Sequence, residues 1–359
     1  MDLREDLPAI DDDQVKNYDL INDGDLIVAD ASEDYEGVCK SVEVKNNDSK
    51  KAISGLHTFL LRGKGDFFVK GFRGYIRYNP LVKASMDRLA TGLKVYGVSK
   101  SNLKLIQIPR PSLLEQSAIT NVLSDADVLI GQLEKLIEKK KKIRQGTTQK
   151  ILTGVNRLVG FDGKWQTKNL GEIADLKNGY SFKSSTYEKR GEFLIVTIAN
   201  VQNGYMDINE CNKICDLPSD IQDHQKLKVG DLLISMTGNV GRICLVSQPR
   251  CLLNQRVGKI VPLNVDKAFL FYLLKDKKFL KQMIINSQGG AQMNIGKNDI
   301  LSYECKVPID LKEQSAIATI LSDMDTEIEK LESQLTKYQN IKQGMMQTLL
   351  TGKIRLLTK

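Results

Sequence analysis

The sequence has few of the side chains that enzymes commonly use for acid–base chemistry. It contains two histidines and one tryptophan in 359 residues. Only His57 and His224 could act as bases near neutral pH, and neither has an obvious Cys, Ser or carboxylate partner in a catalytic arrangement. We interpret both histidines as polar or structural residues.

Two common cofactor motifs are also missing. A methyltransferase needs an Asn/Asp-Pro-Pro-aromatic string to hold its target amine, and the nearest match is Asn79-Pro80-Leu81. A phosphate-binding loop needs G-x-x-x-x-G-K-[ST], but Gly290 to Lys297 has one residue too many and Asn298 after the lysine. We therefore expect no cofactor, no catalytic residue and no enzymatic activity in this chain.

Neither a metal site nor a membrane span is expected. The six cysteines are scattered, and only Cys211 and Cys215 lie close together without a zinc-like pattern around them. The longest apolar run, Phe269 to Leu274, is far too short to cross a membrane, and the first residues lack the apolar core of a signal peptide. These features predict a cytoplasmic protein with reduced thiols.

The chain carries a modest excess of positive charge. Its 52 Lys and Arg against 44 Asp and Glu give a formal charge of +8. That balance favours a polyanionic partner, although ordinary solubility charge explains it equally well. The length predicts two or more domains.

An internal duplication is the most informative feature. Residues 115–158 and 313–356 align at a constant offset of 198 without a gap, and 22 of the 44 positions are identical. Each copy predicts one long helix, with a capping box at Ser112-Leu-Leu-Glu115 or Asp310-Leu-Lys-Glu313 and a glycine stop at Gly154 or Gly352. At about 1.5 Å per residue such a helix spans roughly 60 Å.

Apolar residues within the copies step mostly by three and four, which predicts two coiled-coil seams that pack against each other. The first seam comprises Ile119, Leu123, Ala126, Ile130, Leu133, Ile137, Ile143 and Ile151, and the second Ile317, Leu321, Met324, Ile328, Leu331, Leu335, Tyr338, Ile341, Met345 and Leu349.

Two further features of the repeats have competing interpretations. Gly146 and Gly344 recur at one place although an interior glycine costs a helix about 1 kcal/mol. We expect close packing of the two helices there, and the alternative is a contact point for another subunit. The basic run 139–142 is not kept in the second copy, so we favour a solvated face over DNA binding.

The segments outside the helices predict two mixed α/β globules. Apolar runs at 193–199, 231–235, 243–246 and 259–261 predict strands, and 267–286 predicts a helical stretch. In the first globule Gly24-Asp25-Leu26-Ile27 matches Gly230-Asp231-Leu232-Leu233 at an offset of 206. That offset leaves 165–206 without a counterpart, so we expect a first globule shortened at its start, with an exposed sheet edge where the strand equivalent to 193–199 would lie.

Nearly the whole pattern resembles the DNA-specificity subunit of type I restriction-modification systems. The resemblance rests on PSLLEQSAI and VPIDLKEQSAI, the paired LSD and LTG signatures, Leu170-Gly-Glu-Ile173 with Asn178-Gly179, and the segments at 24–40 and 230–242. Each motif is weak by itself, but their order and duplication are specific.

The resemblance implies an α/β (α+β) protein with two target-recognition domains separated by two long antiparallel coiled-coil helices. We expect domain 1 at 1–110, helix 1 at 111–157, domain 2 at 158–309 and helix 2 at 310–359. Each domain would read half of a bipartite double-stranded DNA site. Two methyltransferase subunits would dock on the helices, and restriction subunits would join the full complex, so that partners perform the chemistry.

Side chains that read base edges are typically Arg, Lys, Asn and Gln, with aromatic and further basic neighbours. The DNA-binding candidates are Lys177, Asn178, Tyr180, Lys183, Asn239, Arg242 and Lys297 in the second globule, and Arg62, Lys64, Arg73, Arg77, Lys94 and Tyr96 in the first. For any one of them a surface charge or turn residue is at least as good an interpretation. An alternative for the whole chain is a coiled-coil interaction scaffold that does not bind DNA.

Overall fold

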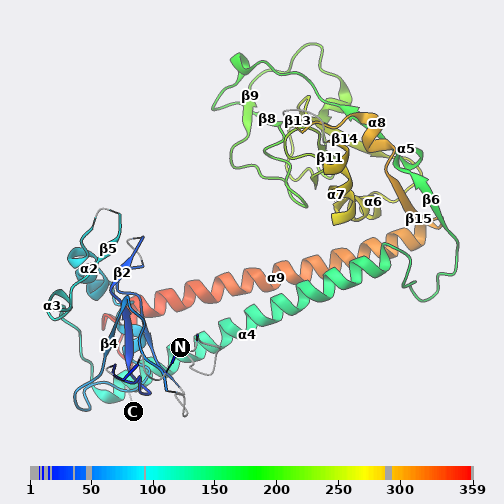
Figure 1. The fold of residues 1–359 in the computed structure, drawn as a ribbon. Coiled ribbons are helices and arrows are strands. Elements are labelled where there is room, and N and C mark those ends of the chain that lie inside the picture. The colour runs from blue at the N-terminus through cyan, green and yellow to red at the C-terminus, as the bar shows by residue number, and fades with distance from the viewer. Residues whose placement is uncertain are drawn as a thin grey trace. The chain divides into compact units, whose positions relative to one another are not determined.

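A computed structural model describes residues 8, 10–11, 15–16, 18–34, 37–45, 51–92, 94–287 and 293–356 (Figure 1). The chain divides into two compact units. Unit 1 comprises residues 1–138 and 330–359, and unit 2 comprises residues 139–329. Both units mix helices and strands and both contain parts of two long helices, which confirms the predicted fold class. The four domain boundaries expected from the sequence stay predictions.

The sheet of unit 1 is small and antiparallel, with β1 at its centre. Its strand order is β3-β1-β4, and a separate pair joins β2 to β5. Three short helices follow the sheet along the chain. The bounds are β1 Leu26–Ala29, β2 Ala31–Ser32, β3 Ser41–Glu43, β4 Thr58–Leu61, α1 Arg73–Ile76, α2 Pro80–Leu89, β5 Tyr96–Gly97 and α3 Lys100–Leu103.

Unit 2 holds two four-stranded sheets, β10-β13-β8-β9 and β12-β11-β14-β7, and the pair β15-β6. Its strands are β6 Trp165–Asn169, β7 Ala174–Asn178, β8 Phe193–Val196, β9 Asn212–Ile214, β10 Lys226–Leu227, β11 Leu232–Ser235, β12 Ile243–Leu245, β13 Cys251–Leu253, β14 Val257–Pro262 and β15 Glu304–Pro308. Its shorter helices are α5 Leu170–Ile173, η2 Ser184–Thr186, η3 Asp223–Gln225, α6 Lys267–Lys275, α7 Lys277–Asn286 and α8 Lys297–Leu301.

All four apolar runs that the sequence assigned to strands contain a strand, namely β8, β11, β12 and β14. The helical stretch 267–286 is two helices rather than one. Asp276 has an extended backbone, and its carboxylate accepts a hydrogen bond from the Lys278 amide at 2.8 Å. A residue that caps a new helix in this way necessarily ends the previous one.

The duplication extends through both globules. Helices α2 and α3 begin 197 residues before their counterparts α7 and α8, and at the same offset α1 falls within α6. Strands β1 and β11 are related by an offset of 206. Gly24 and Gly230 precede these strands, and each donates a backbone hydrogen bond to the valine that follows the paired strand β3 or β12, at 2.9 and 2.8 Å. The two aligned glycines therefore make equivalent hydrogen bonds, which supports the alignment of Gly24 with Gly230.

The open edge of the first globule lies on β4. In unit 2 the equivalent strand β14 pairs with β7 on that side, whereas among the described residues of unit 1 no strand takes that place. The strand whose absence leaves this edge open is therefore β7, which lies in the same stretch without a counterpart as the strand at 193–199. The sheet that contains β8 also has no counterpart among the described residues of unit 1.

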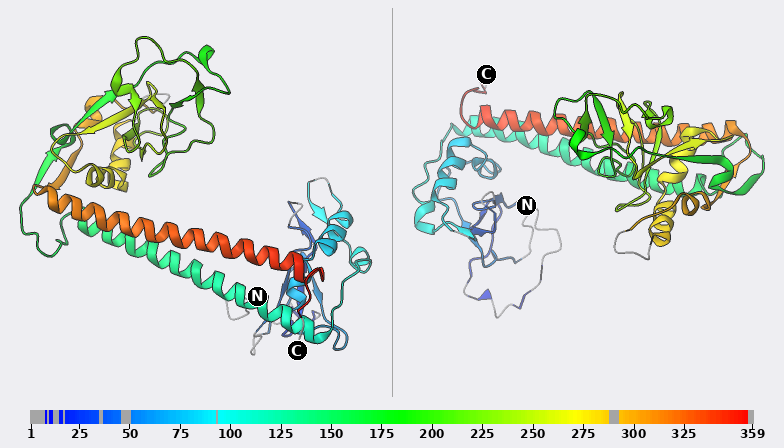
Figure 2. Two further views of the ribbon diagram at one scale, coloured as in Figure 1. Left: turned by 180° about the vertical axis from the view of Figure 1, so that it is seen from behind. Right: turned by 90° about the horizontal axis from the view of Figure 1, so that it is seen from above.

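The long helices are α4, Leu113–Ile151, and α9, Leu311–Leu349. In unit 1 the start of α4 shares a core with the end of α9, and in unit 2 the end of α4 shares a core with the start of α9 (Figure 2). The helices are thus antiparallel in each unit. Gly154 and Gly352 follow the helix ends with φ of 70° and 72°, as a glycine stop requires.

Only part of each expected seam is buried. Ile119, Leu123, Ile317 and Leu321 are at most 1% exposed. Ile143, Tyr338 and Ile341 are instead 46%, 37% and 44% exposed, so their assignment to a buried seam was wrong. A helix with 3.6 residues per turn rotates residues of a 3.5-residue pattern away from the contact line, which explains the drift.

The expectation of close helix packing at the repeated glycines was also wrong. A Cβ atom added at Gly146 or Gly344 would meet no described atom within 4 Å. The alternative, a contact point for another subunit, stays a hypothesis.

Candidate nucleic-acid interface

One end of the sheet β12-β11-β14-β7 gathers most of the second-globule candidates. Strands β7 and β11 finish at this end, and β12 and β14 begin there. Lys177 and Asn178 are the last two residues of β7, and both are exposed. Asn239 and Arg242 lie in the turn between β11 and β12. Four candidates thus come from the end of one strand and from one turn.

Helix α8 brings Lys297 to strand β7, beside Asp175, which is the second residue of that strand. The ammonium groups of Lys177 and Lys297 each lie 2.7 Å from a carboxylate oxygen of Asp175. The hydrogen bond from Lys177, and then that from Lys297, hold the pKa of Asp175 well below its usual range. Two cations share one carboxylate, so the group keeps a net positive charge.

Tyr180 and Lys183 follow β7. The backbone of Tyr180 donates to Leu253, and its hydroxyl donates to the Asp220 carboxylate at 2.7 Å, which raises the pKa of Tyr180. A Cβ at Gly179 would lie 2.1 Å from the Asn254 carbonyl oxygen, so only glycine allows this approach. Lys183 is exposed.

The two candidates in the turn, Asn239 and Arg242, differ in how freely their side chains could contact DNA. The side chain of Asn239 is exposed, while its carbonyl accepts a hydrogen bond from the Ser235 hydroxyl. Arg242 is partly buried, and its guanidinium donates to the Gln202 side chain at 2.6 Å. Arg242 therefore has a structural bond that a DNA contact would have to replace.

Arg256 and Gln255 were not among the candidates. Because they adjoin an apolar run, we interpreted them as structural residues. Both are exposed just before β14, at the sheet end that holds Asn178 and Lys177. Among the described residues Arg256 forms no side-chain ion pair. The sequence could have identified them by their position directly before a predicted strand, next to other polar side chains.

The first globule has an equivalent end, where β1 finishes. A backbone bridge joins Ala31 to Gly97 there, just as one joins Thr237 to Asn294 in unit 2. Lys94 is exposed and Tyr96 partly buried beside this bridge. These two candidates lie at the repeat equivalent of the second-globule cluster.

The other first-globule candidates lie elsewhere. Arg62 follows β4 at the opposite end of the sheet, where its guanidinium binds the Asp25 carboxylate at 2.7 Å. Arg73, on α1, donates to the Gly24 carbonyl at 2.7 Å. Lys64 is exposed in the loop before α1, and Arg77 is the C-cap of that helix. The structure therefore does not bring the six first-globule candidates together.

The described residues contain neither a cluster of metal ligands nor a membrane-spanning helix. They contain no group of three His, Cys, Asp or Glu side chains arranged to hold a metal ion. No described helix is long and apolar enough to cross a membrane.

Comparisons with known proteins agree on one family. A sequence model described as "Type I restriction modification DNA specificity domain" matches residues 162–338. The MjaVIII specificity subunit of Methanocaldococcus jannaschii is 28% identical, over 94% of this chain and 80% of that protein. The MjaX specificity subunit of the same organism is 32% identical, over 73% of this chain and 62% of the relative.

A solved structure shares the fold. The S subunit of a type I restriction-modification system from M. genitalium matches 93% of this chain and 84% of its own, with a TM-score of 0.60 at 17% identity. The family model covers the second globule and part of α9, and the MjaVIII relative aligns over 94% of this chain. This chain belongs to the family of type I restriction-modification specificity subunits.

Proposed function

We propose that this chain supplies DNA sequence specificity to a type I restriction-modification complex by reading DNA with both globules. The observation that carries the proposal is the polar end of the sheet β12-β11-β14-β7. Lys177, Asn178 and Arg256 lie there, and Lys297 shares the Asp175 carboxylate with Lys177. Lys94 and Tyr96 lie at the equivalent place in the first globule.

The chemistry of these side chains suits a duplex. Lysine and arginine bind phosphate oxygens or guanine, and asparagine pairs with adenine through two hydrogen bonds. The carboxylate of Asp175 orders Lys177 and Lys297 without cancelling their combined charge. Arg62 and Arg73 bind groups of their own globule, so we assign them to folding rather than to reading.

The long helices would hold the two readers apart and dock the partners. Because the helix copies are related by an internal repeat, we propose two methyltransferase subunits, one for each copy, joined by restriction subunits in a full complex in the cytoplasm. Methylation and cleavage would then belong to the partners. Residues 1–110 and 158–309 are the proposed readers, and 111–157 and 310–359 the proposed spacers.

The scaffold alternative, in which the chain binds no DNA, is not favoured, because the family match and the relatives are all named for type I specificity. Duplex binding by the chain with its methyltransferase separates the two functions. We expect binding that weakens steeply with salt, since each lysine or arginine on a phosphate releases counterions. Binding that is absent at low salt would refute the proposed function.

A further inference from the structure

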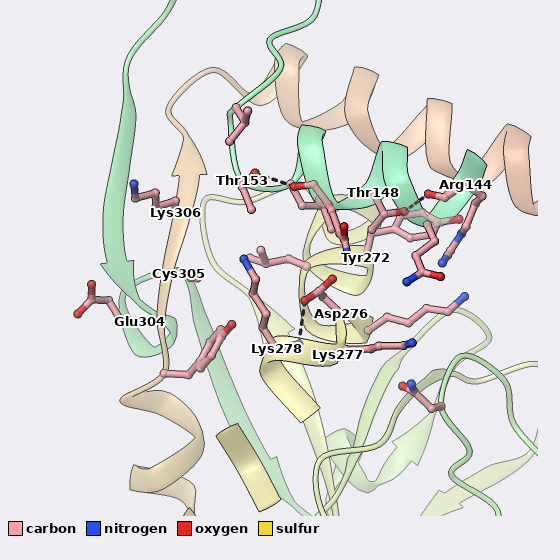
Figure 3. A pocket seen from close by; sticks show the side chains of 18 residues that line it. Arg144, Thr148, Thr153, Tyr272, Asp276, Lys277, Lys278, Glu304, Cys305 and Lys306 are labelled. Carbon is pink, nitrogen blue, oxygen red and sulfur yellow. Dashed lines mark hydrogen bonds between the residues drawn. The ribbon is translucent and has the colours of Figure 1, made fainter. Parts of the chain in front are cut away.

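A cavity of about 910 Å³ lies in unit 2, where the end of α4 meets α6, α7 and β15 (Figure 3). Part of its wall is apolar and aromatic, formed by Leu152, Tyr272, Leu273 and Tyr303. Five cationic side chains also line it, against two acidic ones. The cations are Arg144, Lys275, Lys277, Lys278 and Lys306, and the acids are Asp276 and Glu304.

Two of these cations share one carboxylate. Arg144 binds both oxygens of Asp325, at 2.8 and 3.1 Å, and the Lys275 ammonium lies 3.3 Å from the same group. Arg144 and Lys275 are only 23% and 22% exposed. Two cations face one carboxylate, so positive charge beside the cavity is incompletely balanced. Burial lowers the pKa of Lys275, because it disfavours the charged form of the amine.

Lys277 and Lys278 add charge at the mouth of the cavity. They belong to the first turn of α7, and Figure 3 shows them across the cavity from Arg144. Both are exposed, and neither forms an ion pair with any residue that the structure describes. Asp276 caps α7 through the Lys278 amide, and among the described residues no ion pair joins its carboxylate to either ammonium group.

The internal repeat shows that the fold does not need these lysines. At the offset of 197, Lys275, Lys277 and Lys278 correspond to Tyr78, Pro80 and Leu81 in unit 1. The helix caps, in contrast, correspond as Asn79 and Asp276, and both accept hydrogen bonds from the first turn. The framework is thus kept in both units. The repeat also keeps the cation of α4, since Lys342 pairs with Asp127 as Arg144 pairs with Asp325, whereas the three lysines occur only in the second unit.

We propose that this cavity binds a phosphate-bearing anion, with Arg144, Lys277 and Lys278 as its contacts and Lys275 as the charge beneath them. The apolar wall would accept the sugar or base attached to the phosphate. Two sources share this chemistry, a free nucleotide and the backbone of DNA. If the ligand is the DNA backbone, the inference rests on the proposed function. If the ligand is a free nucleotide, the inference is independent of the proposed function.

Calorimetric titration of the full chain with pyrophosphate, with ATP and with a short duplex of unrelated sequence tests the site. Lys277→Gln and Lys278→Gln each remove one exposed charge at the cavity. Lys281→Gln is the matched control, because Lys281 is exposed on the same helix but does not line the cavity. We expect each cavity variant to weaken binding about tenfold, as for a lost charge-assisted hydrogen bond, and the control to change it less than about twofold.

The three probes separate the sources. Weakened binding of pyrophosphate or ATP identifies a free nucleotide, and weakened binding of the duplex alone identifies the DNA backbone. If no probe binds, or if Lys281→Gln weakens binding as much as the cavity variants do, the site is refuted. Sequence-specific DNA recognition by the wild-type chain is measured in a separate experiment. If the wild-type chain shows no such recognition, the proposed function fails but the nucleotide site does not.

Discussion

Arg157 and Glu313 form a bidentate ion pair, in which the guanidinium donates two hydrogen bonds of 2.8 Å to the carboxylate. Arg157 follows the end of α4, and Glu313 lies in the first turn of α9 with only 1% of its side chain exposed. At the offset of 198, Arg355 and Glu115 form the same pair in unit 1. Each long helix is therefore clamped at its start to the segment that follows the other.

Removing the charge of Glu313 should destabilise the protein. Glu313→Gln leaves the guanidinium of Arg157 without its partner, and we expect a loss of roughly 2–3 kcal/mol in the free energy of unfolding. Urea unfolding of the full chain measures it. The exposed pair of Arg250 and Glu192 is the control, because Glu192→Gln should cost less than about 1 kcal/mol. Equal losses in the two variants would contradict a structural clamp at Glu313.

A pH dependence should arise from Tyr272. Burial, helped by Asp325, raises the pKa of Tyr272 to about 12, whereas an unfolded tyrosine has a pKa of about 10. Because the folded-state pKa is the higher one, this contribution to stability is complete below pH about 10 and is lost as the pH rises towards about 12.

Unfolding in urea between these pH values should therefore show a steeper loss for the wild type than for Tyr272→Phe, which cannot ionise there. Tyr205, which is 62% exposed, provides the control variant Tyr205→Phe, with a wild-type slope. Parallel slopes for the wild type and Tyr272→Phe would rule out this role of Tyr272.

Two glycines of α4 and its C-terminal turn should respond oppositely to alanine. Gly146 lies inside the helix with free space around it, so Gly146→Ala should stabilise the chain by about 0.5–1 kcal/mol. Gly154 has φ of 70°, and a Cβ there would lie 3.1 Å from Trp165, so Gly154→Ala should destabilise the chain by at least about 1 kcal/mol. Thermal unfolding compares the two, and destabilisation by Gly146→Ala would show that helix packing needs this glycine.

The same Gly146→Ala variant tests the subunit hypothesis. If another subunit approaches α4 closely at Gly146, the added methyl group should weaken assembly with the methyltransferase while stabilising the free chain. Titration of the methyltransferase against both proteins measures this. Unchanged affinity would remove Gly146 from the docking surface.

Arg256 should be a reader. Arg256→Gln removes an exposed guanidinium at the polar sheet end, and we expect affinity for the specific duplex to fall by about 1–3 kcal/mol through loss of a bidentate base contact. Arg190→Gln is the control, because Arg190 is exposed in the loop before β8. Equal affinities for Arg256→Gln and the wild type would exclude Arg256 from the interface.

Local patterns predicted the long helices and their ends well. The Ser112 hydroxyl accepts a hydrogen bond from the Glu115 amide, as a capping box requires. A capping box also requires the glutamate side chain to accept a hydrogen bond from the backbone amide of the N-cap residue. That part of the prediction was wrong, because Glu115 and Glu313 bind arginines distant in sequence. A short-range motif cannot reveal a partner more than a hundred residues away.

The repeated EQSAI motif shows the same limit. Its Gln116 and Gln314 are buried and accept hydrogen bonds from the Val69 and Asp266 amides, which attach each helix to its globule. The sequence marked the motif as shared but gave no role for the glutamine.

The candidate readers were predicted less well than the fold. Residue type alone selected Arg62 together with Lys94, although the two lie at opposite ends of one small sheet. The direction of each strand decides at which end of the sheet the residues beside it lie. That direction depends on which strands pair, and the sequence does not show the pairing.

The central claim is that each globule reads its own half of a split DNA site. Genome-wide mapping of methylated adenines, after residues 158–309 are exchanged for those of another specificity subunit, tests it most directly. The account predicts a motif with one half changed and with the other half and the spacing kept. A motif changed in both halves, or in neither, would contradict it.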